Sequence, residues 1–446
     1  LTRMRILIAT IGTRGDVQPY LALARGLKAA GHDVALCTCE RYAPWISQFG
    51  VTHLPLDDSL LRLLESPAGR LLIGQLDSVW GGLRTAWSVL QQVRPMNERL
   101  VADAWTASEV WRPDLIVYHP KLFCMPAISA RRGIPAVLAP LIPMQVATGD
   151  APFWGMPRLP LGRGYNRLTW RVVESLTQLG TRGYLRTWRK AHDPDGRSRH
   201  STPSQLRPGE PITVLHGYSD AVSPRPADWP SYAQVSGYWF LDDPVGSDGA
   251  AWQPSPALLR FLENGPAPVY IGFGSMASAD AAAATQHILA AVSRAGVRAV
   301  LARGWGGLVD TKLPEHVLAL DEAPHAWLFP RMAAVVHHGG AGTTAAGLRA
   351  GCPTLICPFG LDQPFWGDRI KKLGVGPVPL PQKRLSADSL GSALTELVTQ
   401  PRFREAAAGI AAAIRAQDGV ATAVALIERA AGQRPVRTAG AGPAVP

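Results

Sequence analysis

The chain has 446 residues, of which 47% are hydrophobic and 18% charged, and its formal net charge is +11. This length exceeds one typical hydrophobic core, so we expect two domains of roughly 200 residues, each able to bury a core. No apolar run reaches the roughly 18 residues needed to cross a bilayer and no secretory leader is visible at the start, so we expect a soluble, cytoplasmic protein.

The first part of the chain alternates apolar runs with segments of helical periodicity. The pattern predicts, in chain order, a strand at 5–10, a helix at 17–30, a strand at 32–38, helical structure within 57–107, a strand at 113–118, a helix at 123–131 and a strand at 134–138. Strands that alternate with helices are typical of an α/β domain with a parallel sheet.

The loop after the first predicted strand, Gly12 to Asp16, argues against two enzyme classes. It lacks the spaced third glycine of a dinucleotide fingerprint, which disfavours a nicotinamide enzyme. The chain also has no Walker A sequence, so phosphoryl transfer through a P-loop has no support. Aspartate is a residue type that caps helices, and capping of the following helix is one interpretation of Asp16.

Two later segments supply candidate ligand contacts. His119 comes just past a predicted strand end, where doubly wound folds place ligands, although an ordinary loop histidine is an equal alternative. Residues 140–160 are rich in proline, methionine and aromatic side chains and could line an apolar cleft. Within them, Met144, Phe153 and Trp154 are candidate contacts for a lipophilic molecule.

Most of the net charge lies in residues 158–207. This segment has eleven Arg or Lys against three acids, a local balance of +8 within the chain's +11. Together with nearby tryptophans it could rest on an anionic membrane surface, and the alternative is a solvated helical face with a flexible loop. Nucleic acid is disfavoured because no recognisable binding module accompanies the charge.

A linker-like segment divides the chain. Two short strands at 212–215 and 233–235 close the first domain, and the glycine- and proline-rich stretch 237–256 follows. A strand at 268–276 then opens a second series of strands and helices. We therefore expect a first Rossmann-like domain at 1–240, a linker at 241–256, a second Rossmann-like domain at 257–416, a last helix at 417–432 and a disordered tail at 433–446.

The stretch Val335 to Thr344 carries the clearest chemical signal. An apolar run leads two histidines into a glycine-rich turn, and a helical pattern of small residues follows. Such a turn offers backbone N–H groups and the positive end of a helix to an anion, and glycines let a phosphate approach. We interpret it as a diphosphate cradle; the alternative is a tight turn with two ordinary histidines.

The block 323–367, with HHGGAGTT followed by DQPFWG, resembles the nucleotide-sugar signature of GT-B glycosyltransferases in the UDP-glycosyltransferase superfamily. The resemblance is to the sterol glucosyltransferase and glycopeptide or macrolide glycosyltransferase branch in particular, and the early motif GTRGDVQP resembles the same branch. It implies a GT-B fold, in which two Rossmann-like, doubly wound α/β domains face each other across a cleft. The first domain would bind the acceptor and the second the nucleotide sugar.

The resemblance also implies roles for individual residues. Asp16 stands where plant-type relatives have a catalytic histidine, so it is the implied general base. The implied donor-binding residues are Gly15, Ser275, His325, His338, Gly340, Gly342, Thr343, Asp362 and Gln363. Glu322 replaces the family tryptophan that stacks on uracil in plant enzymes, so recognition of the base must differ, for example through Trp305.

The implied reaction is a direct displacement with inversion at the anomeric carbon. It would move a hexose, glucose from UDP-glucose, to a hydroxyl of a lipophilic acceptor such as a sterol or a macrolide. We expect no cofactor and no metal: the five cysteines lack metal-ligand spacing and are expected to be free thiols, and Asp193-Pro194-Asp195 lies in the basic segment. Three alternatives stay open, namely a TDP-deoxysugar-dependent antibiotic glycosyltransferase, a GT-B-fold sugar-nucleotide epimerase and a non-catalytic lipid- or sugar-binding module.

Overall fold

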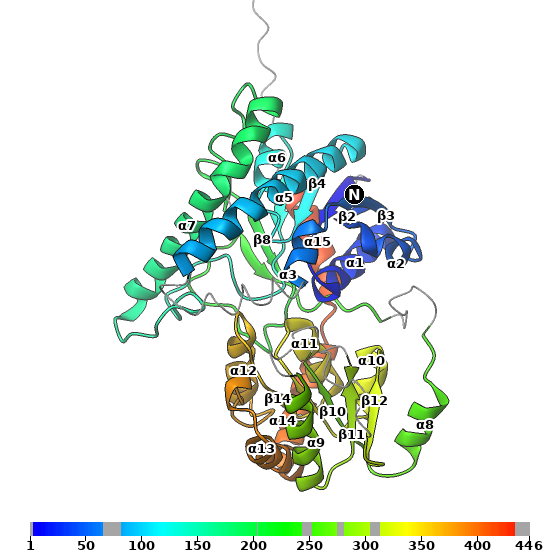
Figure 1. Ribbon diagram of the computed structural model, residues 1–446. Helices are drawn as coiled ribbons and strands as arrows, with labels where there is room; N and C mark the ends of the chain where they lie inside the picture. Colours follow the sequence, from blue (N-terminus) through cyan, green and yellow to red (C-terminus); the bar gives the residue numbers. More distant parts are fainter. Residues whose placement is uncertain are drawn as a thin grey trace, which may run out of the picture.

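The computed structural model describes residues 3–65, 82–202, 204–242, 252–273, 281–303 and 313–432, and places them in two α/β domains (Figure 1). The first domain is built on a seven-stranded sheet in the order β3-β2-β1-β4-β5-β8-β9, and the second on a five-stranded sheet in the order β12-β11-β10-β13-β14. Neighbouring strands are parallel throughout both sheets. The predicted fold class is confirmed.

The first domain contains most of the longer helices. Its strands are β1 (Arg5–Ala9), β2 (Asp33–Cys39), β3 (Thr52–Leu56), β4 (Leu115–Tyr118), β5 (Ala136–Leu138), β8 (Thr213–His216) and β9 (Ala233–Val235). Its helices are η1 (Glu40–Tyr42), α1 (Arg14–Ala29), α2 (Ala43–Ser47), α3 (Ser59–Glu65), α5 (Gly82–Trp111), α6 (Met125–Arg132) and α7 (Gly162–His192). A small antiparallel pair, β6 (Gln205–Arg207) and β7 (Glu210–Pro211), follows α7.

The second domain repeats the alternation of strand and helix. Its strands are β10 (Val269–Gly272), β11 (Ala299–Ala302), β12 (Val317–Leu320), β13 (Ala334–His337) and β14 (Thr354–Ile356). Its helices are α8 (Pro256–Glu263), α9 (Ala281–Arg294), α10 (His325–Leu328), η3 (Phe329–Arg331), α11 (Ala341–Ala350), α12 (Gln363–Lys372), η4 (Gln382–Arg384), α13 (Ala387–Thr399) and α14 (Pro401–Arg415). The last helix, α15 (Gly419–Gly432), belongs in space to the first domain.

Strand β1 illustrates why the first sheet is covered on both faces. Leu7 and Ala9 join the hydrophobic cluster under α5 and α6, whereas Ile6 and Ile8 join the cluster under α1 and α15. Successive side chains of a strand point to opposite faces, so an unbroken apolar strand needs a helical layer on each side. The same logic places ligands at the carboxyl ends of the strands, since the helices occupy both faces.

Several element bounds differ from the sequence-based expectation. Helix α1 begins at Arg14, three residues before the predicted start, so Asp16 lies within its first turn. Helix α7 fills much of the basic segment. Helix α12 was not predicted, because Pro364 and Gly367 are residues that usually interrupt a helix. The proline lies in the first turn of α12, where a helix tolerates it. Helix α8 begins at the last residue of the predicted linker.

The segment that follows β9 approaches the start of α15. A Cβ on Gly237, shortly after β9, would lie 3.1 Å from the Cα of Gly419, where α15 begins. Helix α15 then packs on α1, and the Val420 side chain occupies the space above Gly26 that a larger residue would need. Helix α15 thereby completes the core of the first domain.

No single helix in the described ranges is both long and apolar enough to span a membrane. Helices α14 and α15 reach the required length and composition only when taken together, and they are bent by 41° at their junction. Both contribute buried side chains to the domain cores.

Candidate active site

One carboxylate oxygen of Asp16 caps helix α1. Its Oδ2 accepts a hydrogen bond from the backbone N–H of Thr13 at 2.9 Å, and Thr10 Oγ1 donates to the Asp16 carbonyl at 2.8 Å. Gly12 has a φ of +144°, and a Cβ at that position would overlap the Asp16 carboxylate. Asp16 therefore caps the helix from its first turn, and not as the N-cap residue itself.

The other oxygen, Oδ1, faces two residues that follow β4. Lys121 Nζ donates to it at 2.8 Å, and His119 Nε2 lies 3.5 Å away. His119 Nδ1 accepts a hydrogen bond from the backbone N–H of Lys121 at 3.1 Å, so in the neutral ring the proton is on Nε2 and points toward Asp16. The two oxygens of Asp16 thus have separate surroundings.

The charges of this group follow from burial and from one another. Burial raises the pKa of Asp16, but Lys121, His119 and the N–H of Thr13 outweigh it, so the pKa lies below its ordinary value. Burial lowers the pKa of His119 to about 4. At neutral pH the pair is an ionised carboxylate beside a neutral imidazole, and only the carboxylate is arranged to accept a proton.

Strand β13 ends in the predicted glycine-rich turn, and α11 begins at Ala341. Gly340 precedes the helix, while Gly342 and Thr343 lie in its first turn. The N–H groups of a first helical turn have no partner within the helix and present the positive end of its dipole. A Cβ at Gly342 would meet no atom of the described residues within 4 Å.

The two histidines at the end of β13 have different environments. His337 is fully buried, and its Nδ1 accepts a hydrogen bond from the N–H of Gly339 at 3.0 Å. His338 is partly exposed beside Gly340, and burial lowers its pKa to about 4, so its ring is neutral. Its buried Nδ1 has no hydrogen-bond partner in the part of the chain that the structure describes.

The first turn of α12 carries the predicted sugar-binding pair. Trp366 Nε1 donates to Asp362 Oδ2 at 3.0 Å. Gln363 is buried, and its Oε1 accepts from the N–H of Phe359 at 2.7 Å. Asp362 is therefore the more accessible member of the pair, while the carbonyl oxygen of Gln363 shapes the turn.

Groups from the two domains meet at the domain boundary. Burial raises the pKa of Asp362, and the negative charge of Asp16 raises it further while Lys121 lowers it, which requires these charges to lie near one another. On the same side, the Phe365 ring stacks on Trp154 with ring centroids 5.0 Å apart. The general-base candidate and the sugar-binding candidate thus occupy one region.

A second interdomain contact lies at the predicted nucleotide-base position. Arg14, in the same first turn of α1 as Asp16, forms an ion pair with Glu322, and its guanidinium lies 4.9 Å from the ring centroid of Trp45. His325 stacks on Phe329 at 4.2 Å between ring centroids. Burial lowers the pKa of His325 to about 4, and Arg14 and His338 contribute in the same direction.

The remaining acceptor candidates are not all at this boundary. Trp154 borders α12, as described above. Phe153 turns toward the first domain, where its ring packs edge-on against Trp170 at 5.0 Å, and the Met144 carbonyl oxygen lies 2.9 Å from His216 Nε2. Gly15 is in the first turn of α1 beside Asp16. Ser275 and Trp305 lie outside the described residues.

The described residues contain no group of three or more His, Cys, Asp or Glu side chains arranged to hold a metal ion. Asp193 closes a turn: its Oδ2 accepts from the backbone N–H and the hydroxyl of Ser198 at 2.9 and 2.7 Å. All five cysteines are buried free thiols, as predicted.

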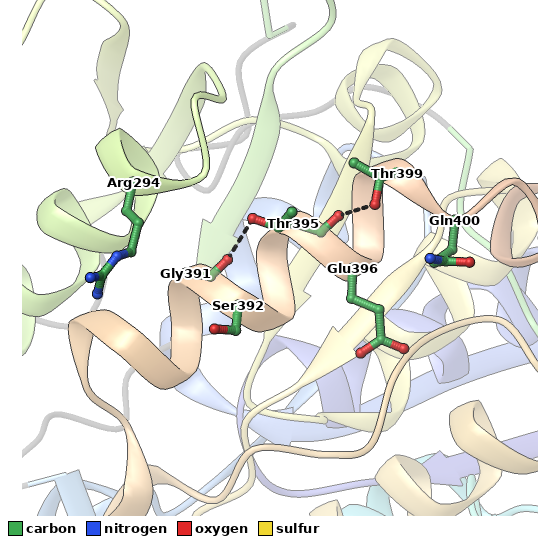
Figure 2. A pocket seen from close by; sticks show the side chains of 7 residues that line it. All are labelled: Arg294, Gly391, Ser392, Thr395, Glu396, Thr399 and Gln400. Atoms are coloured by element: carbon green, nitrogen blue, oxygen red, sulfur yellow. Dashed lines mark hydrogen bonds between the residues drawn. The ribbon is translucent and has the colours of Figure 1, made fainter.

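A separate surface hollow lies between α9 and α13 (Figure 2). Its lining residues are Arg294, Gly391, Ser392, Thr395, Glu396, Thr399 and Gln400. None of the predicted site residues is among them, so we do not assign this hollow to the site.

Sequence reasoning missed Lys121 and Arg14. Lys121 follows the carboxyl end of β4, which pairs with β1, so its strand position beside the Asp16 loop is the signal that could have identified it. Arg14 lies two residues before Asp16 in the first turn of α1, and its contact with Glu322 depends on how the domains dock.

Two family models match the chain. Residues 6–107 match the glycosyltransferase family 28 N-terminal domain, and residues 262–428 match the C-terminal domain of erythromycin biosynthesis protein CIII-like proteins.

Named relatives cover nearly the whole chain. It is 34% identical over 438 residues to a sterol 3-beta-glucosyltransferase of Arabidopsis thaliana, a match that covers 95% of this chain and 68% of that protein. It is also 34% identical to a sterol 3-beta-glucosyltransferase of Neosartorya fischeri, with 96% of this chain covered but only 29% of the fungal protein. The chain thus spans less than a third of the length of such fungal relatives.

Solved structures share the fold. The glycosyltransferase of kitacinnamycin superposes with a TM-score of 0.65 at 20% identity, covering 96% of this chain and 100% of that one. The glycosyltransferase VinC in complex with DTDP superposes with a TM-score of 0.64 at 21% identity and the same coverage.

Proposed function

Since this chain belongs to the GT-B glycosyltransferases of family 1, in the branch of the sterol and macrolide glycosyltransferases, we propose that it transfers glucose from UDP-glucose to a hydroxyl of a lipophilic acceptor. The observation that carries the proposal is the contact between the domains beside Asp16: Arg14, in the same first turn of α1, pairs with Glu322 of the second domain, and the Asp16 charge is near enough to raise the pKa of Asp362. An acceptor hydroxyl and a sugar donor must meet in such a place.

The donor diphosphate would lie on the first turn of α11. The N–H groups at Gly342 and Thr343 and the neutral ring of His338 would donate to its oxygens, and the helix end would offset the charge that develops as it leaves. This cradle supplies the stabilisation that a metal ion supplies in other transferases, so we propose a metal-independent reaction. Asp362 would hold hydroxyls of the hexose.

Asp16 would accept the proton of the acceptor hydroxyl through Oδ1. Lys121 Nζ donates to the same oxygen, His119 Nε2 faces it at 3.5 Å, and Oδ2 is fixed by the helix, so the carboxylate has a defined direction. The oxygen of the acceptor forms a bond to the anomeric carbon while the bond to the diphosphate breaks on the opposite face. A single displacement of this kind inverts the anomeric configuration.

We propose a sterol as the first acceptor class, because relatives over nearly the whole chain are named sterol 3-beta-glucosyltransferases. A TDP-deoxysugar is the second candidate donor. Glu322 stands where plant-type relatives stack a tryptophan on uracil and is held by Arg14, so the uracil-specific contact is missing.

The test is a donor and acceptor panel with product masses as the readout. The protein is incubated with UDP-glucose or TDP-sugars, without added metal, against sterols, macrolides and phenols, beside a His338→Ala variant. A hexose added to a sterol from UDP-glucose, and lost in the variant, supports the proposal. Transfer only from TDP-sugars selects the second donor, and conversion of the sugar nucleotide without acceptor would indicate an epimerase. No turnover of any donor, although the protein binds it, would indicate a binding module.

A further inference from the structure

Helix α7 is the outermost long helix of the first domain, and it lies along α5 (Figure 1). Its inner face is fixed: Trp170, Leu185 and Trp188 are buried, and the Trp188 ring meets Trp105 of α5 edge-on at 5.5 Å between ring centroids. The helix is therefore a well-anchored part of the domain.

The opposite face of α7 leaves an apolar stripe in solvent. Its side chains have exposed fractions between 40% and 65% and are Leu161, Leu168, Val172, Leu176 and Leu179. These positions are separated by 7, 4, 4 and 3 residues, each close to a whole number of helical turns, so they form one line. We call this line the outer stripe. Exposed apolar side chains aligned in this way mark a surface that contacts another phase or molecule.

Cations continue the outer stripe toward the end of the helix. Arg182, Arg186 and Lys190 follow at the same helical spacing, and Arg171 lies at its side. These four side chains are exposed and form no ion pair with any residue that the structure describes. By contrast, Arg163 and Arg167 of the same helix are paired with Asp228.

We propose that the outer stripe docks the protein on an anionic lipid bilayer. The leucines would enter the boundary between headgroups and acyl chains, while the arginines and the lysine would meet lipid phosphates. Charge selects this occupant over a second copy of the chain, because pairing two outer stripes would bring together two segments that each carry a balance of +8.

Docking in this way would bring the acceptor side of the site to the bilayer. The segment before α7 carries Trp154, which stacks on Phe365 of α12, and Arg158, which pairs with Asp368 at 2.9 Å. This segment and α7 are continuous, so a lipophilic acceptor dissolved in the bilayer would have a short path to the domain boundary. This step rests on the proposed function; the docking itself does not.

Vesicle co-sedimentation tests the docking directly. The wild-type chain is mixed with vesicles of phosphatidylcholine alone or with added phosphatidylglycerol, and we expect pelleting with the anionic vesicles that weakens as salt is added. Changing Leu168, Leu176 and Leu179 together to Ser, or Arg182 and Arg186 together to Glu, should reduce the bound fraction by about tenfold or more. Leu259→Ser, an exposed leucine on α8, is the matched control and should leave binding unchanged.

Two results would overturn the inference. One is equal or absent pelleting of the wild-type chain with both kinds of vesicle. The other is a wild-type oligomer that the leucine variant converts to monomer in light scattering, since the outer stripe would then be an interface between copies.

Activity separates this inference from the proposed function. The stripe variants should glycosylate a detergent-dissolved sterol at the wild-type rate and a vesicle-embedded sterol at least about tenfold more slowly. If no sugar is transferred under any condition, the proposed function fails, while the pelleting result still decides the docking.

Discussion

The Asp16→Asn substitution separates the two duties of this side chain. Asparagine keeps a carbonyl oxygen that can accept the backbone N–H of Thr13, now at 2.9 Å from Oδ2, so the cap on α1 is retained. It removes the negative charge from the oxygen that faces Lys121 and His119. The helix should therefore persist while the capacity to accept a proton is lost.

The two expected magnitudes differ widely. Lys121 is 53% exposed, so its pairing with Asp16 contributes no more than about 1 kcal/mol, a change in Tm of about 2–4 °C for a domain of this size. Loss of a general base lowers kcat by about 10²–10⁴-fold, or about 3–5 kcal/mol of transition-state stabilisation. The rate should fall while the fold is scarcely affected.

The assay combines initial rates of sterol glucosylation, thermal unfolding and calorimetric titration with UDP-glucose. Donor affinity should stay within about threefold, because the diphosphate cradle lies in the other domain. Asp418→Asn is the matched control, since Asp418 Oδ1 accepts the N–H of Ala421 at 2.8 Å at the start of α15. A rate within about tenfold of the wild type would mean that Asp16 is a helix cap only, and the general base would have to be sought elsewhere.

Three further predictions concern the second domain and pH. Gly339→Ala should lower the free energy of unfolding by at least about 1–3 kcal/mol in urea titrations. The φ of Gly339 is +100°, and the new Cβ would lie 2.8 Å from Ile356 Cγ2. An unchanged free energy of unfolding would contradict this description of the turn. Trp366→Phe removes the N–H group that donates a hydrogen bond to Asp362 Oδ2. The Kd for the sugar nucleotide, measured by calorimetry, should therefore rise by about tenfold. A Kd equal to that of the wild type would exclude Asp362 from sugar binding. Burial lowers the folded-state pKa of four histidines to about 4 from an ordinary value of 6.5: His119, His216, His325 and His338. The stability that these neutral histidines contribute is complete above about pH 6.5 and is lost as the pH falls toward 4. For each histidine the loss in the free energy of unfolding between pH 7 and 5 is about 2 kcal/mol. Urea unfolding midpoints measured at the two pH values check this prediction, and equal midpoints would refute it.

The sequence was most informative where one physical demand governed a stretch. The run from Val335 to Ala350 had to be strand, turn and helix because apolar, glycine-rich and small-residue patterns follow one another without overlap, and the structure has β13 and α11 there. Buried parallel strands can be predicted in the same way, because they appear in the sequence as short unbroken apolar runs.

It was least informative where two demands overlapped. Helix α7 has apolar residues on its buried face and also on its exposed face, and Gly180 and Gly183 weaken its helix propensity, so the sequence indicated a helical face without fixing its bounds. The contact between Lys121 and Asp16 joins residues that are 105 positions apart, and it exists only because β1 and β4 are neighbours in the sheet. Local sequence patterns do not show which strands are neighbours in the sheet.

The close approach of Gly237 and Gly419 has a mechanical consequence. A Cβ on Gly237 would lie only 3.1 Å from the Gly419 Cα, so the segment after β9 and the start of α15 cannot separate without losing this contact. The orientation of the domains is then set by the contacts that they make, such as Arg14 with Glu322 and Trp154 with Phe365. Because α15 follows the second domain in the chain yet packs on α1, its packing ties the two domains together independently of the segment that precedes α8.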